Sequence, residues 1–485
     1  MYSKLKTDDL KKAGDYTLSE IVVHSRESFD GSSKAKKTDI TSLVAEINIY
    51  EDINEKNLTG QLVISDSTGL PNNMPLTGNE LLSFKLGTPG SSRYYDFEKY
   101  PMVIYKIGEK QPHNPRSQFY ILYFCSKEQI TNQTLKVQRP FSGAVSDMIS
   151  SVALSELGTS KDIYIEGTKG SRKLVIPRFR PFKAIDFLCS MAESSQFNST
   201  GFKWYETADG FHCRSYENMM AVGLDSTRPN NGYFKPTMAG TTRDKGNRDV
   251  TQEMQTMFSY EVIDQFNLMK MLGMGGVASR VLKTDLFNKT FSNADFNYEK
   301  NYDTQHHTEH DGMGMRQGDK KLLPNYPFRN NLALTDYADG TFFHSSETEN
   351  QYDGYTSVSP ENSMLNRIAQ EVALECFKVK FDVPGYTGLS VGEMVGLELP
   401  RYESISVGDI DQDHIMSGRW LVSSIIHKVI PAKSYHSMTV ECLKDSVKSP
   451  YYNETIKVEE GKEDKGKVFE QEKIDEGIFG IFDEY

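Results

Sequence analysis

Apolar and polar residues alternate along the first quarter of the chain with the two-residue period of half-buried β-strands. Leu43, Ala45, Ile47 and Ile49 alternate in this way with the residues between them. Further short strands are predicted at residues 58–65, 80–86, 101–107 and 118–125, with glycine-containing turns between several of them. Five or six short strands over about 110 residues predict a small antiparallel barrel or sandwich.

The next part of the chain has the spacing of helices. Val145, Met148, Ile149 and Val152 form one apolar stripe. A second stripe runs from Phe182 to Met191 and follows Pro181, a residue favoured in the first turn of a helix. Residues 201–205 and 210–214 have the pattern of a β-hairpin that turns at Ala208-Asp209-Gly210. These signals together predict an α+β module.

A long polar segment precedes a return to β-structure. Residues 277–360 are rich in Asn, Asp, Tyr and Gly and only weakly periodic, as is typical of a surface-exposed insertion. A helix is predicted at 361–376, where Leu365, Ile368, Val372, Ala373 and Cys376 share one stripe. Strands are then predicted at residues 377–383, 394–399, 420–429 and 437–443. The charged tail from Lys448 ends in an apolar segment, Ile478–Phe482, and indicates a flexible arm whose tip docks on a neighbour.

These changes of pattern predict a mainly β protein with α+β insertions and two β-barrel modules. The predicted segments are an N-terminal arm (1–15), a first β-barrel (16–128), an α+β insert (129–240), a second β-barrel (241–275 with 365–447), a polar insertion (276–364) and a charged tail (448–485).

Composition supports a globular protein and restricts its class. The chain has 485 residues, which is too long for one ordinary hydrophobic core. With 38% hydrophobic and 25% charged residues, it is too apolar to be disordered throughout. No run of about 18 apolar residues exists for a membrane helix, and the N-terminus lacks the apolar stretch of a secretory signal. The five scattered cysteines form no CxxC pair, which indicates reduced, mostly buried thiols of a protein made in a cytosol. The net charge of −12 excludes tight binding to nucleic acid but allows a duct whose lining repels phosphate.

The sharpest chemical motif is the run from His306 to His310. His306, His307, Glu309 and His310 contain the H-x-x-E-H pattern of one group of zinc peptidases. That chemistry needs both histidines on one turn of a helix, with a glutamate that polarises the zinc-bound water. The flanking residues are polar and glycine-rich and carry no apolar stripe that could anchor such a helix. We therefore predict a solvated loop, with catalytic or structural zinc as the open alternatives.

Two other motifs do not have the residue spacing that a calcium loop or a dinucleotide-binding loop requires. Asp409–Asp413 begins like a calcium loop, but His414 and Trp420 occupy the positions that need Gly and Glu, so an acidic hairpin loop is predicted. Gly273, Gly275 and Gly276 miss the dinucleotide-binding spacing and are interpreted as a flexible joint between modules.

Two further motifs, which would matter only on the protein surface, are also weak evidence of function. Asn198 heads a glycosylation triplet, which has no meaning without a signal peptide. The aromatic pair Trp204-Tyr205 suits a sugar platform but is more typical of the core of a hairpin. The sequence therefore predicts no catalytic residue, no cofactor and no metal site.

Several short phrases, in this order, resemble the central hub protein of T4-type contractile phage baseplates. The phrases are Asn57–Ser67 (NLTGQLVISDS), Thr77–Glu80 (TGNE), Val137–Phe141 (VQRPF), Leu389–Glu393 (LSVGE), Trp420–Val429 (WLVSSIIHKV) and Ser437–Val440 (SMTV). The resemblance spans most of residues 16–447. Residues 277–360 and the tail from 448 look longer than the family's plan requires, which leaves their partners undefined.

The resemblance implies a fold and a set of partners. Hubs of this family carry two domains with the fold of the tail-tube subunit, and three chains form a ring of six such barrels. The ring joins the hexameric tail tube or its initiator above to the trimeric spike below, and contacts the surrounding wedge proteins. DNA and the tape measure protein would pass through its lumen. The implied location is the virion, after assembly in the host cytoplasm, with no membrane anchor and no catalysis.

Three other hypotheses stay open at the level of the sequence. One is a hub of a related contractile injection system. A second is a metal-dependent cell-wall hydrolase centred on His306, His307, Glu309 and His310. The third is a receptor-binding tail protein that uses Trp204 and other aromatic residues to hold glycan.

Overall fold

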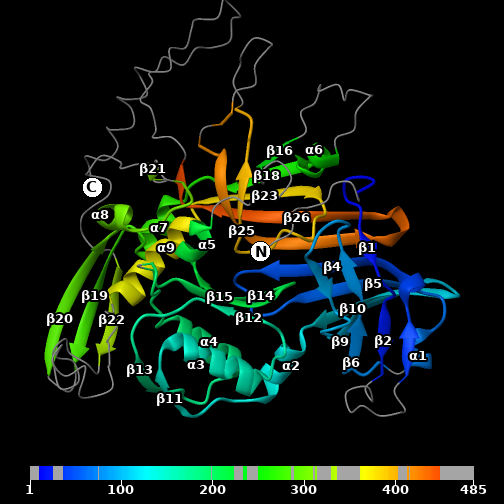
Figure 1. The fold of residues 1–485 in the computed structure, drawn as a ribbon, viewed down its shortest axis with the longest axis horizontal. Coiled ribbons are helices and arrows are strands. Elements are labelled where there is room, and N and C mark those ends of the chain that lie inside the picture. Colours follow the sequence, from blue (N-terminus) through cyan, green and yellow to red (C-terminus); the bar gives the residue numbers. More distant parts are fainter. Residues whose placement is uncertain are drawn as a thin grey trace, which may run out of the picture. The chain divides into compact units, whose positions relative to one another are not determined.

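The chain folds as a mainly β protein with a small number of helices, as the sequence pattern predicts (Figure 1). The computed structural model describes residues 10–25, 36–74, 76–197, 199–222, 233–236, 250–285, 289–309, 312–313, 329–335, 361–401, 412–413 and 415–447. All of them belong to one unit, Met1–Pro450, and the charged tail lies outside the described residues. Within these ranges no helix is both long and apolar enough to cross a bilayer.

A sheet of fourteen strands forms the centre of the fold. Half of its strands come from the N-terminal part: β2 (Val22–His24), β3 (Lys37–Asp39), β4 (Val44–Asp52), β5 (Thr59–Asp66), β6 (Glu80–Ser83), β9 (Met102–Asn114) and β10 (Ser117–Cys125). The other half comes from later in the chain: β16 (Tyr233–Pro236), β17 (Thr256–Met257), β18 (Ser259–Asp264), β23 (Phe377–Pro384), β24 (Met394–Leu397), β25 (Gly418–Ile430) and β26 (Tyr435–Lys444). Most of the predicted strands are therefore confirmed, but the strand predicted at 80–86 is divided into β6 and β7 (Lys85–Gly87), which belong to different sheets, and β9 runs on to Asn114.

The two halves of the sheet meet at one pair of strands, β4 and β25. They pair antiparallel from Asp52 opposite Ser424 to Ile47 opposite Val429, and Figure 1 shows them side by side. The apolar side chains nevertheless form two clusters that largely follow the two halves, although Val429 of β25 belongs to the cluster of the first half. The backbone ladder thus continues across the β4–β25 seam while each half keeps a core of its own.

Residues 127–221 form an α+β insert with a third hydrophobic cluster. Its elements are α2 (Lys127–Thr134), β11 (Pro140–Gly143), α3 (Val145–Ser151), a π-helical turn (Val152–Leu157), β12 (Ile163–Ile165), β13 (Arg172–Val175), α4 (Pro181–Cys189), β14 (Phe202–Thr207), β15 (Gly210–Ser215) and α5 (Tyr216–Ala221). Strands β14 and β15 form the predicted hairpin, and β12 pairs parallel to β15. The apolar stripes of α3 and α4 are buried in this cluster, which explains their helical spacing.

The segment predicted as a polar, surface-exposed insertion is partly built into the fold. Strands β19 (Ala278–Asp285), β20 (Thr290–Asn297) and β22 (Arg329–Thr335) form a sheet. Helix α8 (Tyr298–Asn301) follows β20 in the sequence. Val277, Tyr298 and Tyr302 belong to the hydrophobic cluster of the second half of the large sheet. The buried area here comes from aromatic side chains and not from a periodic apolar stripe. The weakly periodic, polar sequence therefore gave no sign that this segment is packed against the core.

The remaining elements complete this side of the molecule. Helix α7 (Leu268–Met274) ends at Gly275, whose φ of +76° suits a glycine after a helix, so the predicted flexible joint is instead a helix stop. The predicted helix at 361–376 is a π-helical turn (Glu361–Asn366) followed by α9 (Arg367–Leu374). The short elements are β1 (Thr17–Leu18), β7 (Lys85–Gly87), β8 (Tyr94–Asp96), α1 (Leu70–Asn73), α6 (Val250–Met254), β21 (Gly312–Met313) and β27 (Ser446–Val447).

The turn between β14 and β15 depends on a glycine. Gly210 has a φ of +137°, and a Cβ atom there would lie 2.3 Å from the carbonyl oxygen of Asp162. We expect Gly210→Ala to lower the free energy of unfolding by about 1–3 kcal/mol, measured by urea denaturation. Gly158→Ala is the matched control, because Gly158 has a φ of +63° but open space around it. Equal losses for the two variants would mean that the contact with Asp162 relaxes without cost.

Candidate functional site

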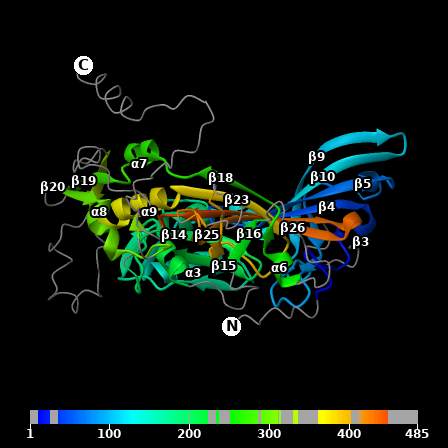
Figure 2. The same ribbon diagram turned by 90° about the horizontal axis from the view of Figure 1, so that it is seen from above.

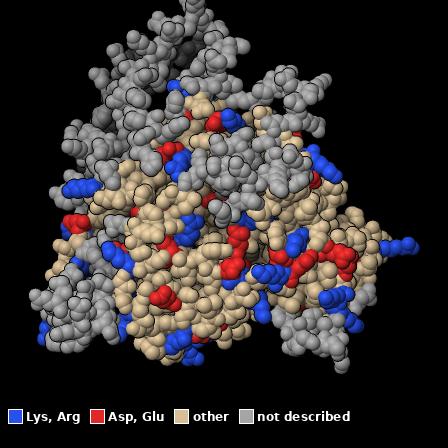
Figure 3. Space-filling view, in the orientation of Figure 1, with Lys and Arg blue, Asp and Glu red and all other residues tan. Residues whose placement is uncertain are grey.

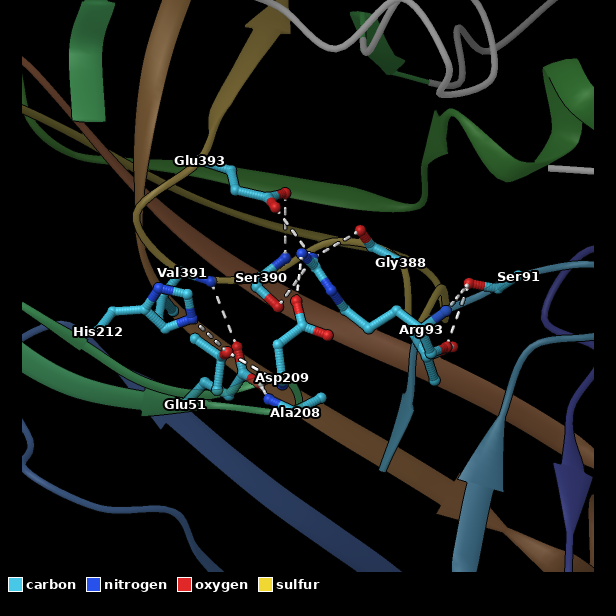
Figure 4. Close-up of polar contacts among 12 residues, drawn as sticks. Glu51, Ser91, Arg93, Ala208, Asp209, His212, Gly388, Ser390, Val391 and Glu393 are labelled. Carbon is cyan, nitrogen blue, oxygen red and sulfur yellow. Dashed lines mark hydrogen bonds and ion pairs between the residues drawn. The ribbon is translucent and has the colours of Figure 1, made fainter. Parts of the chain in front are cut away.

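A buried arginine joins three parts of the chain that are far apart in sequence (Figure 4). Arg93, which is 5% exposed, lies just before β8. Its Nη1 donates to the carbonyl oxygen of Gly388 (3.0 Å), to Ser390 Oγ (3.1 Å) and to Glu393 Oε1 (2.9 Å). Its Nη2 lies 2.7 Å from Asp209 Oδ2 in the β14–β15 turn. One side chain thus connects the N-terminal part of the chain with the turn of the α+β insert and with the loop between β23 and β24. We call this set of residues the Arg93 junction.

A buried carboxylate lies beside this arginine. Glu51, at the end of β4, accepts hydrogen bonds from Tyr95 Oη (2.7 Å) and from the backbone amides of Ala208 (3.2 Å) and Val391 (3.3 Å). Burial raises the pKa of Glu51 to about 7, because desolvation outweighs these donors and the nearby charge of Arg93. Glu51 therefore contacts the same three parts of the chain as Arg93 does.

The raised pKa of Glu51 makes the stability of the fold depend on pH. Folded Glu51 binds its proton more tightly than in the unfolded chain, so its contribution is full below the ordinary value of 4.5 and is lost as the pH rises through about 7. We expect urea denaturation to show a loss on the order of 2 kcal/mol between pH 4.5 and 8, and Glu51→Gln to remove most of it. Glu109→Gln, at an exposed position of β9, is the matched control. An unchanged pH profile in Glu51→Gln would contradict this assignment.

A second buried ion network includes Glu206 on β14 of the same hairpin. Lys161 Nζ lies 2.5 Å from Glu206 Oε1 and 3.1 Å from Glu128 Oε2. Glu206 Oε2 also accepts hydrogen bonds from the Leu58 amide (2.8 Å) and from Ser126 Oγ (2.6 Å). Burial alone would lower the pKa of Lys161, but the two carboxylates outweigh it and hold that pKa above its ordinary value. This network connects the insert to the end of β10 and the start of β5.

The His306–His310 segment is not the solvated loop that its polarity predicts. His307 is buried: its Nδ1 lies 2.7 Å from Asp445 Oδ2 and its Nε2 lies 2.9 Å from the carbonyl oxygen of Tyr302. Both partners offer acceptor atoms, and only the protonated imidazole can donate to both, so this geometry favours the charged form. The pKa of His307 is raised accordingly, because Asp445 and the Tyr302 carbonyl outweigh the effect of burial.

The neighbours of His307 have structural contacts too. The Glu309 carboxylate accepts a hydrogen bond from the Arg419 amide (2.5 Å), and its own amide donates to Ser446 Oγ (2.7 Å). His306 is exposed and meets the ring of Phe197, while His310 lies outside the described residues. In the part of the chain that the structure describes, no group of three or more His, Cys, Asp or Glu side chains could hold a metal ion.

The other sequence motifs have structural roles wherever they fall on residues that the structure describes. The Asp413 carboxylate accepts hydrogen bonds from the amides of Ile415 (2.8 Å) and Met416 (3.0 Å), while residues 402–411 and His414 lie outside the described ranges. Trp204 and Tyr205 are fully buried, as the core interpretation predicts. Asn198 lies outside the described residues. All five cysteines are buried and free, as predicted.

Comparison with known proteins gives one curated relative and several structural likenesses. No family model matches the chain. A probable baseplate hub protein of Vibrio phage KVP40 is 21% identical over 404 residues, which cover 80% of this chain and 87% of that protein.

Two solved tail proteins align with this chain. The tail protein from Neisseria meningitidis MC58 aligns with a TM-score of 0.48 and 10% identity, over 89% of this chain and 97% of that one. The 43 kDa tail protein of prophage MuSo2 from Shewanella oneidensis aligns with a TM-score of 0.48 and 9% identity, over 88% and 99%. The resemblance to a phage baseplate hub protein, first drawn from the ordered phrases of the sequence, is thus confirmed by a curated hub protein that matches 80% of the chain.

Proposed function

We propose that the protein is the structural hub of a contractile phage tail baseplate. Three copies would form a ring that joins the hexameric tail tube above to the trimeric spike below and encloses part of the DNA duct. Wedge proteins would surround the ring, and the tape measure protein and DNA would pass through it. The observation that carries this proposal is the similarity to a baseplate hub protein along 80% of the chain.

The architecture supports two tube-like domains in each copy. The large sheet takes seven strands from residues 22–125 and seven from residues 233–444, and each half has its own hydrophobic cluster. We propose that the domains follow the segments 16–128 and 241–275 with 365–447, separated by the insert (129–240) and the polar insertion (276–364). Three copies with two domains each would present six tube-like domains, which suits a sixfold tube on a threefold spike.

A role without catalysis agrees with the buried polar groups described above. The charged side chains at 51, 93, 161 and 307 contact other parts of the same chain, and these contacts hold the parts together. We propose that the protein is not an enzyme. The hydrolase alternative predicts that His306→Ala abolishes an activity on cell-wall peptide or glycan, whereas a hub variant of this kind should assemble unchanged.

Native mass spectrometry of the purified full-length chain tests the proposal. We expect a species with three times the 55.0 kDa mass of the chain and no bound metal. Negative-stain images of the same sample should show threefold averages with a central opening. A monomer that keeps one tightly bound zinc ion through chelator treatment would contradict the hub and favour the hydrolase.

A further inference from the structure

Two of the five cysteines meet inside the α+β insert. Cys189 is the last residue of α4, and Cys213 lies on β15. Their Sγ atoms are 3.7 Å apart, so that one thiol donates a weak hydrogen bond to the sulfur of the other. In the part of the chain that the structure describes, no other two cysteine sulfurs form such a contact. We call these two residues the Cys189–Cys213 pair.

The local sequence places both thiols on faces that point into the core of the insert. Cys189 follows Ile185 by four residues and so continues the buried stripe of α4. Cys213 follows Phe211 by two residues and shares its inward face of β15, opposite Trp204 on β14. Cys189 is 4% exposed, Cys213 is fully buried, and both belong to the hydrophobic cluster of the insert. The packing of α4 in this cluster therefore holds the two sulfurs together.

The insert forms a layer of its own beside the large sheet. Helices α3 and α4 lie next to each other and next to the sheet of β12, β15 and β14 (Figure 1). Figure 2 shows α3 and α7 on opposite sides of the strands β23 and β25 of the large sheet. A covalent bond inside the insert would thus restrain this layer and leave the strand pairing of the large sheet unchanged.

Only a small movement separates the Cys189–Cys213 pair from a disulfide. A disulfide bond is about 2.05 Å long, so the two sulfurs have to approach by about 1.7 Å in all. Rotation of the two side chains about their Cα–Cβ bonds can supply a movement of this size. The backbone of α4 and β15 therefore need not separate for the bond to form.

The same surroundings keep the pair reduced while the protein is made. The hydrogen bond with Cys189 and burial raise the pKa of Cys213 well above its ordinary value. Because the thiolate is the reactive form of cysteine, a thiol that stays protonated reacts slowly with oxidants. The thiol systems of a cytosol also keep such pairs reduced. Both effects favour two thiols for as long as the chain stays in a reducing compartment.

We propose that Cys189 and Cys213 form a latent disulfide, which closes once the chain has left the reducing cytosol in which it is made. The timing rests on the proposed function, because a baseplate hub leaves its host inside the released particle. The bond would join the end of α4 to β15 across 24 positions of the sequence. A cross-link of this kind stabilises mainly by restricting the unfolded chain, so the oxidised insert should resist unfolding better than the reduced one.

A small neutral oxidant, hydrogen peroxide, suits this site. Figure 3 shows Lys and Arg interspersed with Asp and Glu among the described residues of that face, which gives no advantage to a charged oxidant. Peroxide transfers one oxygen atom to the sulfur of Cys189, the more exposed thiol, which becomes a sulfenic acid while one water leaves. The Cys213 sulfur then attacks the Cys189 sulfur. The S–O bond breaks as the S–S bond forms, and the hydroxyl group leaves with the Cys213 proton as a second water. Two thiols thus lose two electrons to one peroxide molecule.

Counting free thiols tests the proposal on the purified full-length chain. The chain is treated with hydrogen peroxide, denatured in urea, labelled with a maleimide and measured by mass spectrometry. We expect five labels without peroxide and three after it, since the chain has five cysteines and the bond takes up two of them. Peptide mapping should find the peptide of Cys189 linked to that of Cys213, and dithiothreitol should restore all five labels. Five labels after oxidation, or lost labels without this linked peptide, would overturn the proposal.

Alanine variants supply the matched controls. Cys189→Ala and Cys213→Ala should each give no linked peptide. Cys442→Ala, which removes a buried thiol on β26 outside the pair, should still give it. Oxidation should raise the midpoint of thermal unfolding of the wild-type chain by roughly 5 °C and should leave that of Cys189→Ala unchanged. Equal midpoints for the oxidised and reduced wild-type chain would overturn the stabilising role of the bond.

The outcomes separate this inference from the proposed function. A native trimer that gives no linked peptide after oxidation would overturn the disulfide and leave the hub assignment intact. A linked peptide in a chain that stays monomeric in the native mass spectrum would support the disulfide and count against the proposed trimer.

Discussion

Replacing Arg93 by methionine is expected to lower the free energy of unfolding by about 3–5 kcal/mol. The guanidinium is nearly buried and lies between the carboxylates of Asp209 and Glu393, 2.7 and 2.9 Å away. Methionine fills much of the space but leaves both carboxylates, and Glu51 nearby, without their positive partner. Such a loss is costly because a buried charge without a partner keeps its desolvation penalty.

Urea denaturation of the full-length protein at pH 7.5 measures this effect. Arg116→Met is the matched control, because Arg116 is exposed at the turn after β9 and should change stability by less than about 0.5 kcal/mol. A loss below about 1 kcal/mol for Arg93→Met would mean that water replaces the guanidinium easily. The Arg93 junction would then be a surface contact and not the connection between three parts of the chain.

The second large effect is expected for Trp204→Ala, at about 3–5 kcal/mol. Trp204 on β14 has no exposed surface and stacks on Phe211, with 5.1 Å between ring centroids, inside the cluster of the α+β insert. Truncation to alanine removes the largest side chain of this cluster and leaves a cavity that its neighbours fill only in part. Trp204→Phe should lose much less, because it keeps most of the apolar volume.

Thermal unfolding measures the loss of stability in Trp204→Ala, and a variant at an exposed aromatic residue serves as the matched control. Phe291 on β20 is 66% exposed, and Phe291→Ala should shift the free energy by no more than about 0.5 kcal/mol. If Trp204→Ala left stability unchanged but abolished binding of the chain to host cells, Trp204 would belong to a glycan platform and the core assignment would be wrong.

Local periodicity predicted those elements of this fold that have one face against a core. The alternation from Leu43 to Ile49 becomes β4, and the stripe of Phe182, Ile185 and Leu188 becomes the buried side of α4. Periodicity carries no information about which strands pair. The ladder between β4 and β25 joins residues that no local pattern relates.

The candidate site was predictable only in part. Glu51 continues the inward-facing series of Ile47 and Ile49, so the strand pattern alone could have marked it as a buried carboxylate. The role of His307 could not be read in this way, because its partner Asp445 lies 138 residues away. The polarity around His307 indicated solvent, whereas the side chains there bond to one another and to β27.

The β4–β25 seam has a consequence for how the chain is made. Strand β25, which pairs with the edge of β4, is synthesised roughly 370 residues after β4. At ribosomal speeds this synthesis takes about 20–70 s. Pairing over so large a sequence separation is slow to form. During that time the edge of β4 stays open, so the yield of folded protein should depend on keeping this edge apart from other nascent chains.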